Sequence, residues 1–305
     1  DHPAEQRVLF PEKYLVLLAY GKEARADGRG TVAEVIAGRI EKSGGQMLSD
    51  ELAEHEWAER FHIMKVKRLG PSVVPAEAVL PLKHLAEVLE ELETKIRQPL
   101  ALEGMGVSGD EIVLLGFIPQ DQRRLGYSLT FPLYLTVAKT AKRHGGRAYS
   151  TGLYFAGEAP SVFGSERLQA LKSFKAETDP RGILNPGKVL RSKLSGMIGL
   201  AIRFEGLLRP FGNLSKVKLE ERIGSRTIKG IPPEVVWYAY ACSSCGYCVD
   251  ECDQYYGRMW ESQSPRGKWF FIRELVEGRE TLDQEAVNTF MVCTTCELCN
   301  VMCSE

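Results

Sequence analysis

Apolar residues along positions 13–190 recur with two alternating periods. Tyr14–Tyr20 and Ile112–Ile118 are runs rich in branched apolar side chains, which is typical of short buried strands. Elsewhere apolar residues recur every three or four positions, as on an amphipathic helix. The expected helices run from Val32 to Gly44–Gly45, from Pro81 to Ile96, from an extended start at Tyr127 to Gly145–Gly146, and from Ser165 to Thr178. This mixture predicts an α+β sandwich.

A basic segment follows at residues 191–235. Residues 191–230 carry nine lysines and arginines against three glutamates, a net charge of +6, although the whole chain has a net charge of −1. The segment also repeats apolar residues at helical spacing, at Met197, Leu200, Ala201, Phe204, Leu207 and Leu208. One interpretation is a linker helix packed on its own protein. The other is an interfacial helix that docks on a membrane or on an acidic partner.

Composition excludes several classes of protein. The chain has 305 residues, enough for about two domains, and its 44% hydrophobic and 26% charged residues are typical of a globular protein. Its near-neutral charge provides no field that would attract nucleic acid, and no apolar run approaches the roughly 20 residues that span a bilayer. Because the chain begins at Asp1 without an initiator methionine or signal peptide, and ends two residues after its last cysteine, we expect a fragment or a processed subunit.

The cysteines are confined to one end of the chain. All eight lie between residues 242 and 305, in two copies of C-x2-C-x2-C-x3-C, the spacing of bacterial [4Fe–4S] ferredoxins. In that pattern one tight loop supplies three thiolates to one cluster, and the fourth cysteine ligates the other cluster. The expected ligands are Cys242, Cys245, Cys248 and Cys303 for the first cluster, and Cys252, Cys293, Cys296 and Cys299 for the second.

Zinc and disulfides are the alternatives for these cysteines. Structural zinc also takes four thiolates, but usually from two separated C-x2-C pairs. Here each run has a third and a fourth cysteine in register and none is left over, which favours clusters. Disulfides would be spread over the fold of a secreted protein, so the clustering favours a reducing compartment. Asp253 and Ser304 stand where a ferredoxin run usually ends in proline, and this departure removes no ligand.

The region between the two cysteine runs is expected to be helical. With its flanking cysteines it resembles the α-helical ferredoxin domain in the iron–sulfur subunits of glycolate oxidase, anaerobic glycerol-3-phosphate dehydrogenase and heterodisulfide reductase. The run Ser264-Pro265-Arg266-Gly267-Lys268 matches the S-P-R-G element of that group. We expect Arg266 and Lys268 to offset cluster charge or donate to its sulfurs, with an ordinary turn as the alternative. Residues 236–305 are therefore interpreted as a mostly α-helical two-cluster ferredoxin domain.

The end of the N-terminal part carries a second resemblance. Residues 177–188 read E-T-D-P-R-G-I-L-N-P-G-K and resemble the D-P-x-G-I-L-N-P-G-K ending of the FAD-linked oxidase C-terminal domain, which closes glycolate oxidases and D-lactate dehydrogenases. Trp57-x-x-Arg60 and Gly145–Gly146 extend the likeness upstream. It implies a ferredoxin-like α/β sandwich cap domain over residues 1–190, with Arg60 on the substrate carboxylate and Asn185 on the flavin side. It also implies FAD, held mostly by a domain or subunit outside this chain.

Several family residues are missing from this part. Metal-dependent members carry H-x-G-D-G-N-x-H and a later E-H-G, but none of the histidines at positions 2, 55, 62, 84 and 144 lies in such a run. Residues 149–154 stand where E-H-G is expected, and Pro75 stands where a lysine is expected. His144 or a tyrosine is the remaining candidate for the base. The glycines at 104, 106 and 109 fit G-x-G-x-x-G but precede a strand, so we interpret them as a loop and not as a dinucleotide site.

Two functions fit these features. The first is a flavin- and iron–sulfur-dependent oxidoreductase that passes electrons from a 2-hydroxy acid through FAD and two [4Fe–4S] clusters to an acceptor protein or quinone. The second is a non-catalytic electron-transfer or scaffold subunit that links a separate flavoprotein to a quinone, cytochrome or heterodisulfide-type partner. A heterodisulfide-type reductase itself would need C-C-G repeats downstream. Either protein is expected in the cytoplasm, or peripherally at the inner face of the membrane.

Overall fold

The computed structural model describes residues 14–20, 31–60, 63–124, 126–152, 155–190, 192–214 and 230–303, and it divides the chain into two compact units, Asp1–Ile63 and Met64–Glu305. The first unit contains α2 (Val32–Lys42) and α3 (Asp50–Glu59). Thr31 begins α2 with a capping box, in which its side chain accepts from the backbone of Glu34 and the Glu34 carboxylate accepts in return. The prediction of a buried strand at 14–20 is wrong, because these residues form no strand and are exposed.

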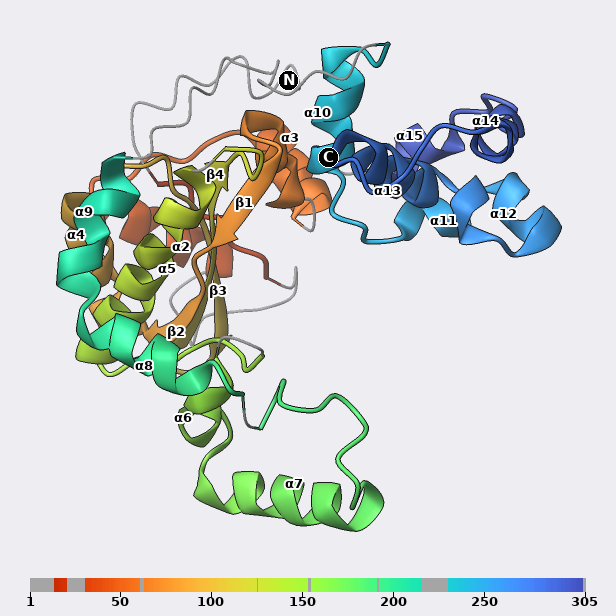
Figure 1. The fold of residues 1–305 in the computed structure, drawn as a ribbon. Coiled ribbons are helices and arrows are strands. Elements are labelled where there is room, and N and C mark those ends of the chain that lie inside the picture. Colours follow the sequence, from red (N-terminus) through yellow and green to blue (C-terminus); the bar gives the residue numbers. More distant parts are fainter. Residues whose placement is uncertain are drawn as a thin grey trace. The chain divides into compact units, whose positions relative to one another are not determined.

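The second unit begins with an antiparallel sheet (Figure 1). Its strands are β1 (Ser72–Pro75), β2 (Ala78–Pro81), β3 (Ala101–Ser108) and β4 (Glu111–Gln120). The long strand β4 is central: β1 and β2 pair with successive parts of one edge, and β3 pairs along the other. Together with the helices that cover it, this sheet confirms the predicted α+β fold of the N-terminal part.

Helices α4 (Leu85–Lys95) and α5 (Gly126–Arg143) provide the core of this part. The core is formed by buried side chains from both helices and from the sheet, including Val74, Leu80, Val88, Leu92, Leu114, Ile118, Leu133 and Val137. The predicted extended start of α5 is wrong, because the helix is continuous from Gly126 through Pro132. Its first turns bury Thr130 and Leu133, and this tertiary packing outweighs the cost of proline within a helix.

The glycine-rich run at 104–109 lies in strand β3 up to Ser108 and is not the predicted loop. Gly104 faces β4 so closely that an added Cβ would lie 2.9 Å from the Cδ1 atom of Ile112. Gly109 has a φ of +53°, which allows the tight turn from β3 into β4. The run is followed by a strand and not by a helix, so it lacks the context of a dinucleotide-binding loop, as the sequence indicated.

The chain then passes through α6 (Ala159–Phe163) and α7 (Ser165–Thr178), and returns to the cap through α8 (Ser195–Arg203) and α9 (Glu205–Leu214). Helix α5 contacts both the sheet and α9 (Figure 1). Glu205 is buried and accepts a 2.6 Å hydrogen bond from the hydroxyl of Thr136. An added Cβ at Gly212 would lie 2.8 Å from Cγ of Leu133. Helices α8 and α9 are therefore packed on their own protein, as one interpretation of the basic segment predicted.

The C-terminal part is helical, as expected. Its helices are α10 (Pro233–Ala241), α11 (Tyr247–Asp250), α12 (Asp253–Arg258), α13 (Pro265–Val276), α14 (Gln284–Met291) and α15 (Leu298–Met302). Helix α10 packs against α13 and buries Val236, Trp237 and Tyr240. The expected domain boundaries at residues 190 and 235 stay predictions.

Candidate iron–sulfur centre

The two cysteine runs repeat one backbone conformation. Cys242 and Cys293 each follow a helix, α10 and α14 respectively. The second residue after each has a positive φ, +57° at Ser244 and +54° at Thr295. The fourth does so too, +93° at Gly246 and +64° at Glu297. A positive φ is uncommon for residues other than glycine, so its recurrence at matching positions indicates a shared structural requirement.

A short helix then carries the third cysteine of each run, and the fourth lies next to a helix end. Cys248 lies on α11 and Cys299 on α15, while Cys252 precedes α12 and Cys303 follows α15. Helix α11 packs against α15, and the third cysteine of each run lies near the fourth cysteine of the other, Cys248 near Cys303 and Cys299 near Cys252. None of the eight cysteines forms a disulfide.

The electrostatics divide the thiols into two groups. Burial raises the pKa of Cys248 to about 11, and the nearby thiols of Cys242, Cys245 and Cys303 raise it further. Burial also raises the pKa of Cys299, with contributions from Cys293, Cys296 and Cys252. Each group therefore contains three cysteines from one run and one from the other. Thiolates this close together need a cationic centre to stabilise them, and an iron–sulfur cluster provides one.

Arg266 lies against the first cysteine loop. Ser264 caps α13, and Gly267 in its first turn has no room for a side chain, because an added Cβ would lie 2.0 Å from the carbonyl oxygen of Glu261. Arg266 Nη1 donates to the carbonyl of Ser244 at 3.3 Å. Its pKa is raised mainly by its ion pair with Glu261, and further by the Cys248 and Cys242 thiols. The ordinary-turn alternative for this run is therefore wrong, because the run begins a helix that places a cation beside the loop.

Lys268, Arg273 and Lys67 add further donors near the cysteine runs. Lys268 donates to the carbonyl of Phe290 at 3.4 Å, three residues before Cys293. Arg273 Nη2 donates to the carbonyls of Ala239 and Cys242 at 3.1 and 3.2 Å. Lys67 is 5% exposed, and its ammonium donates to the hydroxyl of Ser243 at 2.8 Å. Sequence reasoning missed Arg273 and Lys67, because their partners are distant in the chain and no local motif marks them.

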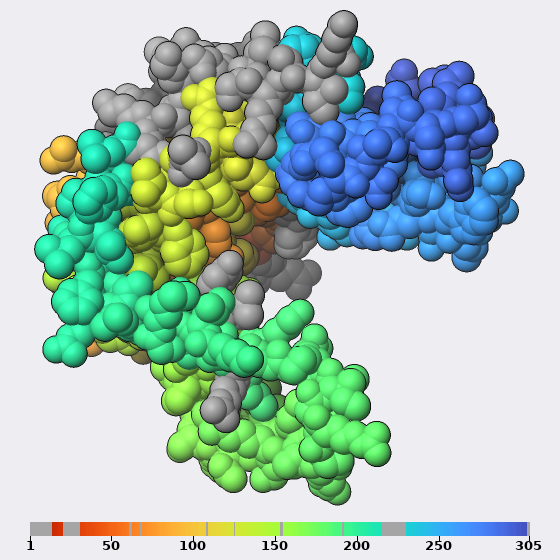
Figure 2. All heavy atoms as spheres, in the orientation of Figure 1, coloured from red at the N-terminus to blue at the C-terminus, as the bar shows by residue number. Residues whose placement is uncertain are grey.

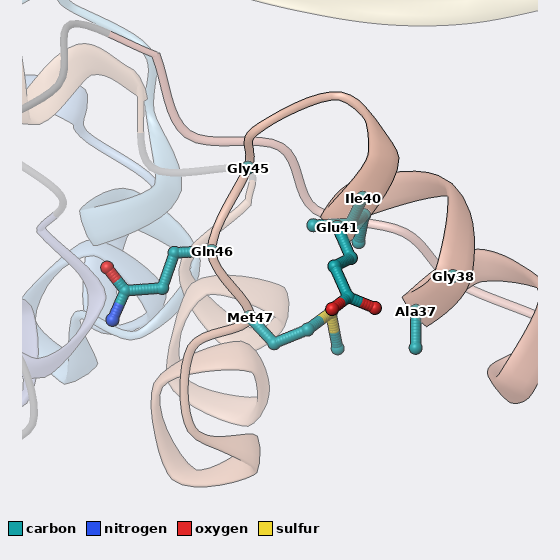
Figure 3. A pocket seen from close by; sticks show the side chains of 7 residues that line it. All are labelled: Ala37, Gly38, Ile40, Glu41, Gly45, Gln46 and Met47. Carbon is teal, nitrogen blue, oxygen red and sulfur yellow. The ribbon is translucent and has the colours of Figure 1, made fainter.

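The candidate residues of the cap lie in different settings. The Arg60 guanidinium stacks on the Trp57 ring at 4.1 Å from its centroid and donates to the Trp57 carbonyl, within the first unit. Asn185 is exposed and has a φ of +45°. The described residues also form a hollow on α2 and the following turn, lined by Ala37, Gly38, Ile40, Glu41, Gly45, Gln46 and Met47 (Figure 3). These observations leave the substrate role of Arg60 and the flavin role of Asn185 as predictions.

The D-P-x-G-I-L-N-P-G-K ending is organised by Asp179. Its two carboxylate oxygens accept from the backbone N–H groups of Ile183 and Leu184, each at 2.9 Å, and its ion pair with Lys175 lowers its pKa. Gly182 and Gly187 have φ values of +64° and +69°, which explains the glycines of the motif. The motif is therefore a hydrogen-bonded turn held by one aspartate.

The sequence offers His144 or a tyrosine as the candidate base. His144 follows α5 and lies between the carboxylates of Glu87 and Glu91. Tyr134 is a core residue, and burial raises its pKa well above the usual range, so its phenol stays protonated at neutral pH. Neither observation identifies a base for substrate oxidation.

Comparisons with known proteins agree with this architecture. Residues 6–189 match the family described as FAD linked oxidases, C-terminal domain, and residues 241–305 match the 4Fe-4S dicluster domain. The chain belongs to the FAD-linked oxidase C-terminal family and continues into a 4Fe-4S dicluster domain, as both resemblances predicted. No curated protein and no solved structure matches it.

These two domains define a flavin and iron–sulfur oxidoreductase with an electron-transfer role. The dicluster domain and its eight cysteines imply two [4Fe–4S] clusters, and the grouped thiols fit them. The oxidase domain implies a partner domain that binds FAD. Over the part of the chain that the structure describes, every helix is too short or too polar to cross a membrane.

Proposed function

We propose that this chain is the cap and electron-transfer component of an oxidoreductase that oxidises a 2-hydroxy acid. The observation that carries the proposal is one chain joining an FAD-linked oxidase domain to two similarly folded cysteine loops. When bound, FAD takes two electrons from the acid, and the clusters pass electrons on singly to an acceptor. The chain itself supplies the cap over the substrate and the thiols that hold both clusters.

Crossed ligation is part of this proposal. Cys242, Cys245, Cys248 and Cys303 would hold one cluster, and Cys252, Cys293, Cys296 and Cys299 the other. The packing of α11 on α15 and the thiols that act on Cys248 and Cys299 support this division. Arg266 would lower the energy of the anionic first cluster through its positive charge, because opposite charges attract strongly where water is partly excluded.

Arg60 provides the test of substrate class. In the complex with its FAD-binding partner, anaerobic addition of glycolate or D-lactate should bleach the flavin and then reduce the clusters. Arg60→Ala should raise the KM for the acid about 10- to 100-fold, because it removes a bidentate, charge-assisted contact to the carboxylate. Arg39→Ala, which removes another arginine of the first unit, is the matched control and should leave the KM unchanged.

The outcomes separate the two candidate functions. Equal KM values for Arg60→Ala and Arg39→Ala would refute the role of Arg60. If no 2-hydroxy acid bleaches the flavin while dithionite still reduces the clusters, the non-catalytic scaffold function is favoured. The sequence lacks the H-x-G-D-G-N-x-H run of metal-dependent members of the family, and this observation supports the second function.

We also propose that α8 and α9 bind an anionic membrane surface. Their buried positions Ile198, Glu205 and Gly212 face the cap. Six apolar residues on these two helices are 46–74% exposed: Met197, Leu200, Phe204, Leu207, Phe211 and Leu214. In Figure 2 the two helices lie at the surface of the second unit. An apolar stripe of this kind, within the segment 191–230 of net charge +6, suits anionic lipid.

Vesicle sedimentation tests this membrane proposal. The protein should sediment with phosphatidylglycerol-containing vesicles at low salt and much less with pure phosphatidylcholine. Leu207→Gln combined with Leu214→Gln should weaken binding at least about tenfold, because both exposed side chains would leave the lipid. Phe174→Gln removes an equally exposed apolar residue from α7 and should change nothing. Unchanged binding of the double variant, or no binding by the unaltered protein, would refute the proposal.

A further inference from the structure

Three side chains with metal-binding atoms meet where α4 begins and α5 ends. They are His84, which precedes α4, Glu87 in its first turn, and His144, which follows α5. Nδ1 of His84 lies 2.8 Å and Nδ1 of His144 lies 3.2 Å from the same carboxylate oxygen of Glu87. One ligand atom from each residue lies within 4.8 Å of the other two. The donors described above beside the cysteine runs are Lys67, Arg266, Lys268 and Arg273, so this set of residues is separate from the cysteine centre.

The spacing of these atoms suits a small transition metal ion. Zinc binds imidazole nitrogen at about 2.0–2.1 Å and carboxylate oxygen at about 2.0–2.2 Å, so two ligand atoms of a tetrahedral ion lie roughly 3.4 Å apart. The observed separations of 2.8 and 3.2 Å are shorter than that value, the first by about 0.6 Å and the second by about 0.2 Å, so small side-chain rotations would fit the atoms around an ion. The Glu87 side chain is 58% exposed, which leaves room for water as a fourth ligand.

A second carboxylate orients one of the imidazoles. Nε2 of His144 lies 3.1 Å from the Oε2 atom of Glu91. Glu91 is itself held by the hydroxyl of Thr140 at 3.1 Å and by ion pairs with Lys95 and Arg143. Histidines that bind metals commonly donate their other ring N–H to a carboxylate in this way.

This hydrogen bond has a consequence for the other ring nitrogen. If Nε2 carries the proton that it donates to Glu91, the lone pair of Nδ1 faces the anionic oxygen of Glu87. A lone pair and a carboxylate repel each other unless a proton or a metal ion lies between them.

The three residues lie at the ends of two helices, α4 and α5, that pack into the core. Val88 and Leu92 of α4 are buried in the core, as are Thr140 and Ala141 of α5, and the two helices contact each other. His84 and Glu87 are three residues apart, which places both on one side of the first turn. The packing of α4 and α5 therefore fixes the backbone positions from which the three side chains meet.

We propose that His84, Glu87 and His144 bind one zinc-class divalent ion, with Glu91 orienting His144 and water completing the coordination. These residues correspond to neither the H-x-G-D-G-N-x-H nor the E-H-G pattern. The ion would join α4 to α5 on the cap. A site that mixes imidazole and carboxylate ligands favours zinc over magnesium or calcium.

The experiment must distinguish this site from zinc bound to cysteine. Cluster-loaded protein, with about eight irons per chain, is equilibrated with Zn²⁺, dialysed and measured for zinc content and zinc-edge X-ray absorption. We expect one zinc per chain with only nitrogen and oxygen neighbours at about 2.0–2.1 Å. Sulfur neighbours at about 2.3 Å, or no retained zinc, would refute the site.

Variants locate the ion within the cap. His84→Gln, Glu87→Gln and His144→Gln should each weaken zinc binding at least about 100-fold, and Glu91→Gln about 10- to 100-fold, as expected for a residue that orients a ligand. His55→Gln changes a histidine on α3 and should leave binding unaltered. Because Glu87 is largely exposed, its replacement should preserve the fold, and unchanged zinc binding in that variant would refute the proposal.

Discussion

Replacing Cys245 and Cys303 together by alanine is expected to leave one cluster in the chain, whereas replacing Cys245 and Cys252 together is expected to leave none. The first pair belongs to one proposed ligand set, so both changes damage the same cluster. The second pair takes one ligand from each set. Iron content should therefore fall to about four atoms per chain in the first variant and to about zero in the second.

Ligation within each run predicts the reverse result. Cys245 and Cys252 would then share a cluster, and their joint replacement would leave about four irons, while the Cys245 and Cys303 pair would leave none. Iron analysis under anaerobic conditions, with far-UV circular dichroism as a check on folding, decides between the two. Alanine is preferable to serine because a serine oxygen could replace the lost thiolate as a ligand. The matched pair Cys296 and Cys252 should behave as Cys245 and Cys303 do.

Local sequence was sufficient where neighbouring residues determine the structure. The helix expected at 165–178 is α7, and it ends at Thr178 because Asp179–Pro180 follows directly in the chain. The same applies to the cysteine loops, whose spacing alone indicates a cluster. The metal-binding character of residues 242–303 was therefore predictable without knowledge of the fold.

Long-range packing explains the errors. Gly104 and Gly106 suggest a loop, yet they lie in β3 because this segment pairs with β4. Pro132 and the apolar residues around it suggested an extended start, yet burial against the sheet makes this stretch helical. Tyr14–Tyr20 has the composition of a strand but forms no strand pairing.

The additional polar contacts had no sequence signal for a related reason. Arg273 binds backbone carbonyls more than thirty residues away, and any residue type could provide those acceptors. His84 and His144 were visible as histidines, but only the contact between α4 and α5 brings both to Glu87. Sequence patterns specify local conformation, whereas these sites arise from the tertiary fold.

Replacing Asp121 by alanine is expected to destabilise the second unit by about 3–5 kcal/mol, because it leaves the buried guanidinium of Arg123 without its counter-ion. The two side chains are 6% and 1% exposed. Two hydrogen bonds join them, from Nε and Nη2 of Arg123 to the two carboxylate oxygens, each at 2.8 Å. Nη1 of Arg123 is buried and has no hydrogen-bond partner, so the Asp121 carboxylate provides most of the stabilisation of the guanidinium charge.

Urea unfolding of the cluster-loaded protein at pH 7, followed anaerobically by circular dichroism, measures this loss. Adding Arg123→Met to Asp121→Ala should restore most of the stability, because both charges are then replaced by apolar groups.

Glu111→Ala is the matched control, because it breaks an exposed ion pair with Arg147. The Glu111 and Arg147 side chains are 43% and 33% exposed, and the change should cost about 1 kcal/mol or less. A loss below about 1 kcal/mol for Asp121→Ala would show that other groups stabilise the buried charge. No recovery in the double variant would show that the loss does not come from the unpaired charge of Arg123. Recovery would show instead that the ion pair's importance lies in neutralising Arg123, which lies over the ring of Tyr240 on the helix leading to Cys242.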